Sequence, residues 1–327
     1  MSCRVSGSVG KILVIRGGAI GDFILTLPAL RALRERFSTA RIEVLGYPRI
    51  VDLAVAGGLV DQAESIEARA LAFFFAKGGD LNTDLSRYFS EFDLIISYLY
   101  DPDSIFRTNV GRCSRAQFIQ GPHRPDEGDS ISAGRVYLKP LERLAIFDAD
   151  EVPRLDLAGV TLEAGSKPDL QKAVHSEGLL ALHPGSGSER KNWPEEKWLK
   201  LIHLLVTRTG LNFLLVGGEA EASRLRGLEE SIPIERRRVA INRPLPELGR
   251  QLCLCTGFLG HDSGISHLAS AVGLSGIVLW GPTQVKVWRP PSRRFKVLQH
   301  PRGLDGLEPG TVFIELCDHL KILDLSN

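Results

Sequence analysis

Five glycine-containing loops carry most of the residues that could do chemistry, and they occupy residues 16–22, 183–188, 217–219, 261–264 and 281–283. Glycine lets backbone N–H groups approach a ligand closely, and the N-terminus of a following helix adds partial positive charge. The second loop also holds the hydroxyls of Ser186 and Ser188 around Gly187, and Lys191 follows it. In any single loop, the glycines could simply be there because a tight turn between a strand and a helix requires them. Together with Lys191, they suit a phosphate or diphosphate and predict a nucleotide or nucleotide sugar in the C-terminal half.

The N-terminal loop excludes one common nucleotide site. Its spacing is Gly17-Gly18-x-x-Gly21, not G-x-G-x-x-G, and Asp22 follows at once, where its carboxylate would repel a pyrophosphate. We therefore exclude an NAD site. Asp22 itself leaves two roles open. It could cap a helix, which contributes about 1 kcal/mol, or it could accept a proton from a hydroxyl nucleophile.

Hydrolase and metal chemistry fit the remaining polar residues poorly. Asp262, Ser263 and His267 include the three residue types of a catalytic triad, but they are sequence neighbours and no G-x-S-x-G motif occurs. His261, Asp262 and His267 do not have a zinc-ligand spacing, so we expect no metal site. A glycosidase would need two carboxylates across a cleft and would leave the phosphate-suited loops unexplained.

The elements that must position these loops alternate between apolar runs and amphipathic segments. Where apolar residues follow one another, we predict strands at residues 11–15, 41–45, 93–97, 179–183, 212–216, 257–260, 275–280 and 295–298. Helical periodicity predicts helices at residues 22–37, 194–208, 246–254 and 263–272. This rhythm is typical of parallel sheets covered on both faces, whose ligands bind at the carboxyl ends of the strands.

The same rhythm starts twice, which predicts an α/β fold of two domains. Residues 148–176 are poorly periodic, so we expect domains at residues 1–155 and 178–327, joined by a linker at 156–177. A length of 327 residues fits two domains. Both should be doubly wound and Rossmann-like, facing each other across a cleft.

Composition excludes several classes of protein. Lys+Arg 40 against Asp+Glu 39 gives a net charge of +1, which argues against nucleic-acid binding as the main function. Five cysteines without C-x-x-C spacing favour buried thiols in a reducing compartment. No apolar run is long enough to be a signal peptide or to cross a bilayer. We therefore expect a cytoplasmic protein.

Four segments resemble the glycosyltransferase family 9 heptosyltransferases. These segments are IRGGAIGDFILTLP at residues 15–28, HPGSGSERKNWPEEKW at 183–198, GHDSGISHLASA at 260–271 and LWGPT at 279–283. They occur in the family's order and span nearly the whole chain. One departure is Gln284-Val285, where many relatives have Asp-Pro.

The resemblance implies a GT-B fold with the acceptor on the N-terminal domain and the sugar nucleotide on the C-terminal domain. It further implies metal-independent, inverting transfer of heptose from ADP-heptose to a lipopolysaccharide inner-core acceptor. Asp22 matches the family's general base, and Lys191 matches the residue that stabilises the leaving diphosphate. The residues implied in donor binding are Ser186, Gly187, Ser188, Glu219, Asp262, Ser263, Gly264 and His267.

No family motif covers the acceptor side, where two segments leave alternatives open. The first segment holds the cationic residues Arg107, Arg112, Arg115 and His123, together with Arg124. They either form a basic patch that binds an acidic sugar such as Kdo, or a phosphate, or they form a solvated face. The apolar run at residues 71–76 is either core or a lip that contacts a lipid-linked acceptor at the inner face of the cytoplasmic membrane. The second interpretation implies a protein peripheral to that membrane.

Two other functions compete with the leading hypothesis. One is a family 9-like transferase with another nucleotide sugar or a non-lipopolysaccharide acceptor. The other is a catalytically silent protein that binds sugar nucleotides. Because a binding protein needs no base, the presence of both Asp22 and Lys191 favours an enzyme.

Overall fold

The computed structural model describes residues 9–157, 178–219 and 221–323. The chain divides into two compact units, residues 1–151 and 152–327. The division falls four residues before the predicted domain end at 155, and the Leu155 N–H donates to the Ala271 carbonyl of the second unit. Most of the predicted linker lies outside the described residues.

The first unit is built on a five-stranded parallel sheet in the order β3-β2-β1-β4-β5. The chain leaves β1 toward one edge and later returns to the other side of it, so β1 and β4 flank the switch point where ligands of such sheets bind. The strands are β1 (Lys11–Arg16), β2 (Arg41–Gly46), β3 (Gln62–Ser65), β4 (Leu94–Ser97) and β5 (Gln117–Gln120).

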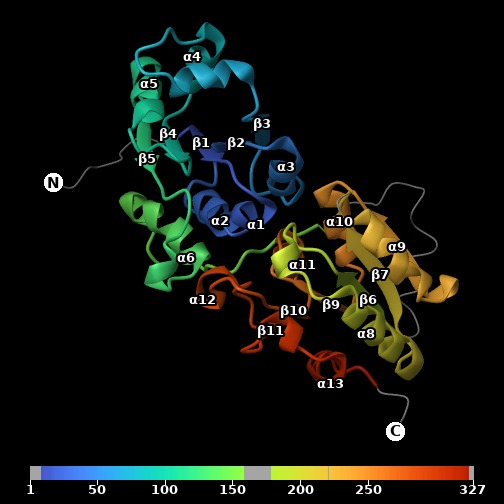
Figure 1. Ribbon diagram of the computed structural model, residues 1–327. Coiled ribbons are helices and arrows are strands. Elements are labelled where there is room, and N and C mark those ends of the chain that lie inside the picture. Colours follow the sequence, from blue (N-terminus) through green and yellow to red (C-terminus); the bar gives the residue numbers. More distant parts are fainter. Residues whose placement is uncertain (1–8, 158–177, 220, 324–327) are drawn as a thin grey trace. The chain divides into compact units, whose positions relative to one another are not determined.

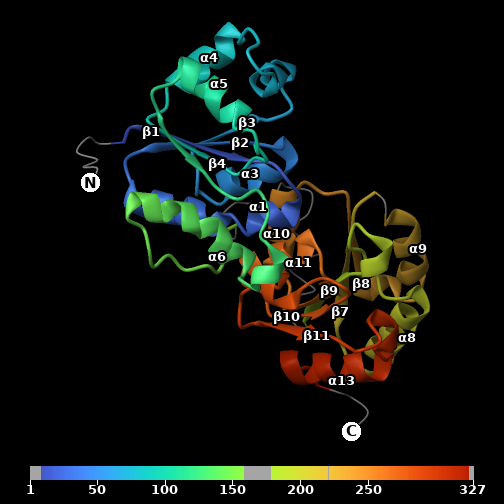
Figure 2. The ribbon, with the colours of Figure 1, turned by 60° about the vertical axis from the view of Figure 1, so that its left-hand side comes forward.

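Helices cover both faces of this sheet, as Figures 1 and 2 show: α4 and α5 lie on one side, and α1 and α6 lie on the other. Buried side chains such as Leu13, Phe89 and Phe106 form the core on the α4–α5 face. The helices are α1 (Ile20–Ile24), α2 (Leu27–Arg36), α3 (Pro48–Ala56), α4 (Thr83–Ser90), α5 (Ile105–Cys113) and α6 (Ala133–Leu138), with 3₁₀ helices η1 (Arg69–Phe75), η2 (Glu127–Asp129) and η3 (Lys139–Leu144).

The single helix predicted at residues 22–37 is wrong, because the chain forms α1 and α2 there. Pro28 has no N–H to donate back to a residue of α1, so the first helix stops and Pro28 lies in the first turn of the second. Thr26, between them, donates its hydroxyl to the Asp22 carbonyl. The break leaves Asp22 on a short helix directly after β1.

The second unit repeats this design with six parallel strands in the order β11-β10-β9-β6-β7-β8. Here the switch point lies between β6 and β9. Both units are doubly wound, as predicted. The strands are β6 (Leu179–His183), β7 (Asn212–Gly217), β8 (Arg237–Ile241), β9 (Gly257–His261), β10 (Gly276–Leu279) and β11 (Phe295–Leu298).

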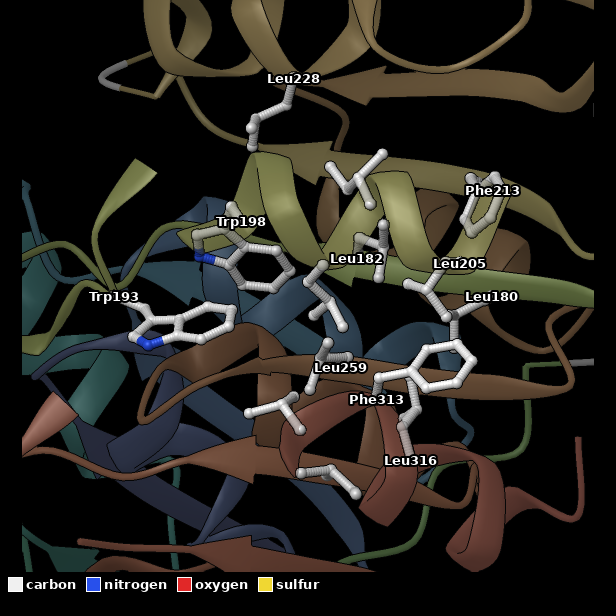
Figure 3. Close-up of a cluster of buried hydrophobic side chains, with 14 of the residues drawn as sticks. Leu180, Leu182, Trp193, Trp198, Leu205, Phe213, Leu228, Leu259, Phe313 and Leu316 are labelled. Atoms are coloured by element: carbon white, nitrogen blue, oxygen red, sulfur yellow. The ribbon is translucent and has the colours of Figure 1, made fainter. Parts of the chain in front are cut away.

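The core of the second unit sits beneath the loop that follows β6. Trp193, at the end of that loop, packs edge-on against Trp198 with ring centroids 5.6 Å apart, and Figure 3 shows both beside Leu182. The loop is therefore anchored by large buried rings. The helices are α8 (Glu195–Arg208), α9 (Ala222–Glu230), α10 (Leu245–Leu252), α11 (Gly264–Ala271), α12 (Val285–Trp288) and α13 (Pro309–Leu320), with 3₁₀ helices η4 (Glu189–Lys191), η5 (Ile234–Arg236) and η6 (Leu304–Gly306).

Candidate active site

In the second unit, a lysine and an aspartate meet at the switch point. Lys191 Nζ lies 2.7 Å from Asp262 Oδ2, and the Thr283 hydroxyl donates to the same oxygen over 2.6 Å. The Asp262 side chain is buried, whereas the Lys191 side chain remains partly exposed. Three loops predicted to bind the donor, those after β6, β9 and β10, therefore converge on one carboxylate.

The loop after β6 is stiffened by its own side chains. Ser186 Oγ lies 2.7 Å from Asn192 Oδ1 and 2.8 Å from the Ser188 carbonyl oxygen. Gly187 is exposed with φ at +72°, a conformation that favours glycine. The Ser186 hydroxyl thus orders the loop, which brings the backbone at Gly187 and Ser188 to the surface.

His261, which sequence analysis did not assign to the site, fixes both ends of this loop. Its Nε2 accepts the Trp193 N–H over 2.9 Å, so the proton is on Nδ1, which faces the Gly185 carbonyl at 3.3 Å. Burial lowers the pKa of His261 to about 3, so the ring is neutral at physiological pH. The neutral form is the one that can accept the Trp193 hydrogen bond. His261 thereby holds the segment that carries Lys191.

The start of α11 completes this edge. Ser263 is the N-cap residue and accepts the Ser266 N–H over 3.3 Å, Gly264 begins the helix, and His267 is buried one turn further on. The Ser266 hydroxyl donates to the His261 carbonyl. The partial positive charge of the helix N-terminus therefore lies next in sequence to Asp262 and adds to the field of Lys191.

After β7, Glu221 contacts the loops of the site, whereas the predicted Glu219 is exposed. Glu221 Oε2 accepts the Gly218 N–H over 2.9 Å. A Cβ on Gly185 would come within 2.4 Å of Glu221 Cγ, so Glu221 packs directly on the loop after β6. Glu221 is the residue immediately before α9, and nothing in the sequence distinguished it from Glu219.

In the first unit, Asp22 is held from three directions. Its Oδ2 accepts the Ala19 N–H over 3.1 Å, while Oδ1 lies 3.3 Å from the Tyr137 hydroxyl and 3.6 Å from Arg16 Nη2. Gly18, at φ +97°, allows the turn that brings the carboxylate back over the loop. The side chain is still 27% exposed. The Asp22 carboxylate therefore accepts a hydrogen bond at the N-terminus of α1, as a helix-capping role requires. Part of the carboxylate is also accessible to a ligand.

Arg16 and Tyr137 are site residues that the sequence did not reveal. The Arg16 guanidinium is buried 4.3 Å above the Tyr137 ring and donates to the His123 carbonyl over 2.9 Å. Burial raises the pKa of Tyr137 to about 12 despite the nearby Arg16, so its hydroxyl stays protonated and donates to Asp22. Both groups thus orient the Asp22 carboxylate.

The four residues predicted as a basic acceptor patch do not gather at one edge. Arg107 is in the first turn of α5, near the C-terminal ends of the strands, and His123 follows β5 at the same edge. Because α5 runs back between two parallel strands, Arg112 and Arg115 lie at its far end, before β5 begins. Arg112 there donates to the Gly79 carbonyl over 2.9 Å. Arg124, the fifth residue considered, pairs with a neighbouring glutamate.

The apolar run at residues 71–76 is divided between core and surface. Leu71 and Phe74 are buried, which confirms the core interpretation for these two. Phe73 is 55% exposed and Phe75 is 42% exposed, with the Phe75 ring stacked on Phe106 at 4.9 Å. The 3₁₀ helix η1 therefore presents two aromatic rings to its surroundings.

The described part of the chain holds neither a metal-ligand cluster nor a helix that could span a membrane. Within residues 9–157, 178–219 and 221–323, no three His, Cys, Asp or Glu side chains are grouped so that they could hold a metal ion. Within the same ranges, every helix is too short or too polar to span a bilayer.

Parts of this chain are similar to known heptosyltransferases. Residues 145–304 match the model of glycosyltransferase family 9 (heptosyltransferase). Lipooligosaccharide heptosyltransferase 2 of Haemophilus influenzae is 27% identical over 173 residues, which are 50% of this chain and 50% of that protein. Lipopolysaccharide heptosyltransferase 1 of Salmonella typhimurium is 34% identical over 117 residues, which are 35% of each chain. The chain thus spans half or less of these two relatives.

A solved structure extends the likeness to the fold. The Escherichia coli ADP-heptose lipopolysaccharide heptosyltransferase II has a TM-score of 0.74 at 16% identity, covering 95% of this chain and 98% of that one. The predicted α/β fold of GT-B type, with two doubly wound parallel sheets, is confirmed. The predicted resemblance is confirmed as well: residues 145–304, just under half of the chain, match glycosyltransferase family 9, the heptosyltransferases, and the curated relatives above are heptosyltransferases.

Proposed function

We propose that the protein transfers heptose from ADP-heptose to a saccharide of the lipopolysaccharide inner core, with inversion and without a metal. The observation that carries the proposal is the Lys191–Asp262–Thr283 cluster at the β6/β9 switch point, beside the N-terminus of α11. A cation and a helix N-terminus are groups that stabilise a departing diphosphate. The proteins that this chain resembles are named heptosyltransferases, and the name of one of them includes ADP-heptose.

In the proposed reaction, Asp22 accepts the proton of the acceptor hydroxyl as its oxygen bonds to the anomeric carbon. The bond from that carbon to the diphosphate oxygen breaks, and ADP leaves with the electron pair. Lys191 and the α11 N-terminus stabilise the negative charge that grows on the diphosphate. Apart from Glu219, which follows β7, the other predicted donor residues lie in the loop after β6 and at the start of α11; they are Ser186, Gly187, Ser188, Ser263, Gly264 and His267.

Ranking nucleotides by thermal shift tests the donor. At a concentration of about 100 Kd, a ligand stabilises the folded protein by about 2.7 kcal/mol, which corresponds to roughly 5–10 °C in Tm for a domain of this size. We expect this shift with ADP and ADP-heptose in the presence of EDTA, and little shift with UDP or GDP. A larger shift with UDP or GDP, or one that EDTA abolishes, would contradict the proposed donor or the absence of a metal.

The same assay decides which of the two glutamates, Glu219 or Glu221, contributes to donor binding. Because Glu221 packs on the loop after β6 and Glu219 is exposed, Glu221→Gln should reduce the ADP shift more than Glu219→Gln. The reverse order would restore the original assignment to Glu219.

We further propose that the protein is peripheral to the inner face of the cytoplasmic membrane, where its lipid-linked acceptor would lie. Phe73 and Phe75 are exposed on η1, and Arg69 and Lys77 flank them. Aromatic rings beside cations suit an anionic lipid surface.

Vesicle sedimentation tests this surface. The double variant Phe73→Ser/Phe75→Ser should lower partitioning onto phosphatidylglycerol-containing vesicles by about tenfold or more, because each half-buried ring contributes roughly 1 kcal/mol or more on insertion. Phe147→Ser, which removes another exposed phenylalanine of the same unit, is the matched control. Equal partitioning of the wild type and the double variant would overturn the proposed membrane surface.

A further inference from the structure

The geometry points to an acceptor-saccharide subsite formed by Tyr100 and His123 beside Asp22. The inference rests on the proposed function, since it deepens the acceptor side of that reaction. Its ligand class is a pyranose ring that stacks on the Tyr100 face and directs a hydroxyl toward Asp22.

The topology brings the three residues to one edge of the first sheet. Asp22 follows β1, Tyr100 follows β4 and His123 follows β5, and these strands are consecutive neighbours in the sheet. The carboxyl ends of β1 and β4 flank the switch point, which is where ligands of doubly wound sheets bind. The candidate subsite therefore lies at the expected place in the fold.

A short series of contacts connects the aromatic pair to the carboxylate. The rings of Tyr100 and His123 meet edge-on with centroids 4.6 Å apart. The His123 carbonyl accepts Arg16 Nη1 over 2.9 Å, and Arg16 Nη2 lies 3.6 Å from Asp22 Oδ1. The buried Arg16 guanidinium thus lies between the His123 backbone and the carboxylate of Asp22, the candidate base.

The backbone on both sides of Tyr100 is fixed. The Gln120 side-chain amide donates to the Leu99 carbonyl over 2.9 Å and to the Gly121 carbonyl over 3.1 Å, which ties the ends of β4 and β5 together. On the other side, the Asp101 carboxylate accepts hydrogen bonds from the Phe106 and Arg107 N–H groups in the first turn of α5. The backbone that carries Tyr100 is therefore held in place before a ligand binds, so that binding need not order it.

The exposure of Tyr100 has no structural explanation within the first unit. Tyr100 is 66% exposed, although tyrosine usually buries its apolar body. A rigid, exposed aromatic face with a hydroxyl at its edge is suited to a ligand that has both apolar C–H faces and hydroxyls. A sugar ring has this character, and the neighbouring imidazole supplies a polar contact at its rim.

Steady-state kinetics with a lipid-free inner-core oligosaccharide, obtained by deacylation, tests the subsite at saturating ADP-heptose. Tyr100→Ala should raise the acceptor KM by about tenfold or more, with little change in kcat, in the donor KM or in the ADP-induced thermal shift. Tyr100→Phe should restore the acceptor KM to within about threefold, since it keeps the ring face. Phe147→Ala, another exposed aromatic residue of this unit, is the control.

An unchanged acceptor KM in Tyr100→Ala, or an equal rise in the donor KM, would overturn the subsite and leave the proposed transferase intact. If the wild type transfers no heptose, the proposed function fails instead. The subsite is then judged by calorimetric titration of the same oligosaccharide. Binding that Tyr100→Ala weakens by about tenfold supports the subsite, and absence of binding to the wild type overturns it.

Discussion

Replacing Asp22 by asparagine should lower kcat for heptose transfer by about 10³-fold and leave ADP binding unchanged. An asparagine amide cannot accept the proton of the acceptor hydroxyl. With its oxygen toward the Ala19 N–H, the asparagine keeps that hydrogen bond, and its amide N–H can donate to the Tyr137 hydroxyl, which can also accept. The substitution therefore removes the base and keeps most of the local structure. Single-turnover rates with ADP-heptose and a deacylated core acceptor provide the measurement.

The control is Asp84→Asn, which makes the same chemical change on the exposed surface of α4. It should leave kcat and the unfolding midpoint unaltered. Asp22→Asn turnover at the wild-type rate would remove the general-base assignment and leave Asp22 as a helix-capping residue only. A loss of ADP-induced thermal stabilisation in Asp22→Asn would instead indicate that the substitution damages the protein beyond this carboxylate.

The loops of the candidate site could be placed from sequence because each follows a buried strand. β6 and β9 are fully buried apolar runs, as central parallel strands must be. Two edge strands, β3 and β8, give no such signal. β3 reads Gln-Ala-Glu-Ser and is only half-buried, and β8 begins with two arginines, so sequence analysis missed both. β5 was missed as well, so the order β1-β4-β5, which brings Asp22, Tyr100 and His123 to one edge of the first sheet, could not be deduced.

Side-chain partners were beyond the sequence for a related reason. His261 and Gly185 are 76 positions apart, and only the pairing of β6 with β9 brings them together. Arg16 was recognised as the first residue of a loop, but its contact with the His123 carbonyl depends on the order β1-β4-β5. The roles of Asp22 and Lys191 came from the family resemblance, and they remain predictions that kinetics must test.

Lys191→Ala should lower kcat/KM for ADP-heptose by about 10²–10³-fold, because it removes a preorganised charge from the departing diphosphate. This variant also affects stability. Asp262 is buried, and after the substitution only the Thr283 hydroxyl remains of its two side-chain donors. A buried carboxylate that loses its cation is costly, so the free energy of unfolding should fall by about 1–3 kcal/mol.

A double variant separates these two effects. In Lys191→Ala/Asp262→Asn, the buried charge is gone and the asparagine oxygen can still accept the Thr283 hydroxyl, so stability should return to within about 1 kcal/mol of the wild type. Turnover should stay low, since no cation faces the diphosphate. Lys286→Ala removes an exposed lysine three residues after Thr283, and it should change neither stability nor turnover. If the double variant regains turnover together with stability, Lys191 serves only to neutralise Asp262, and the leaving-group role passes to the N-terminus of α11.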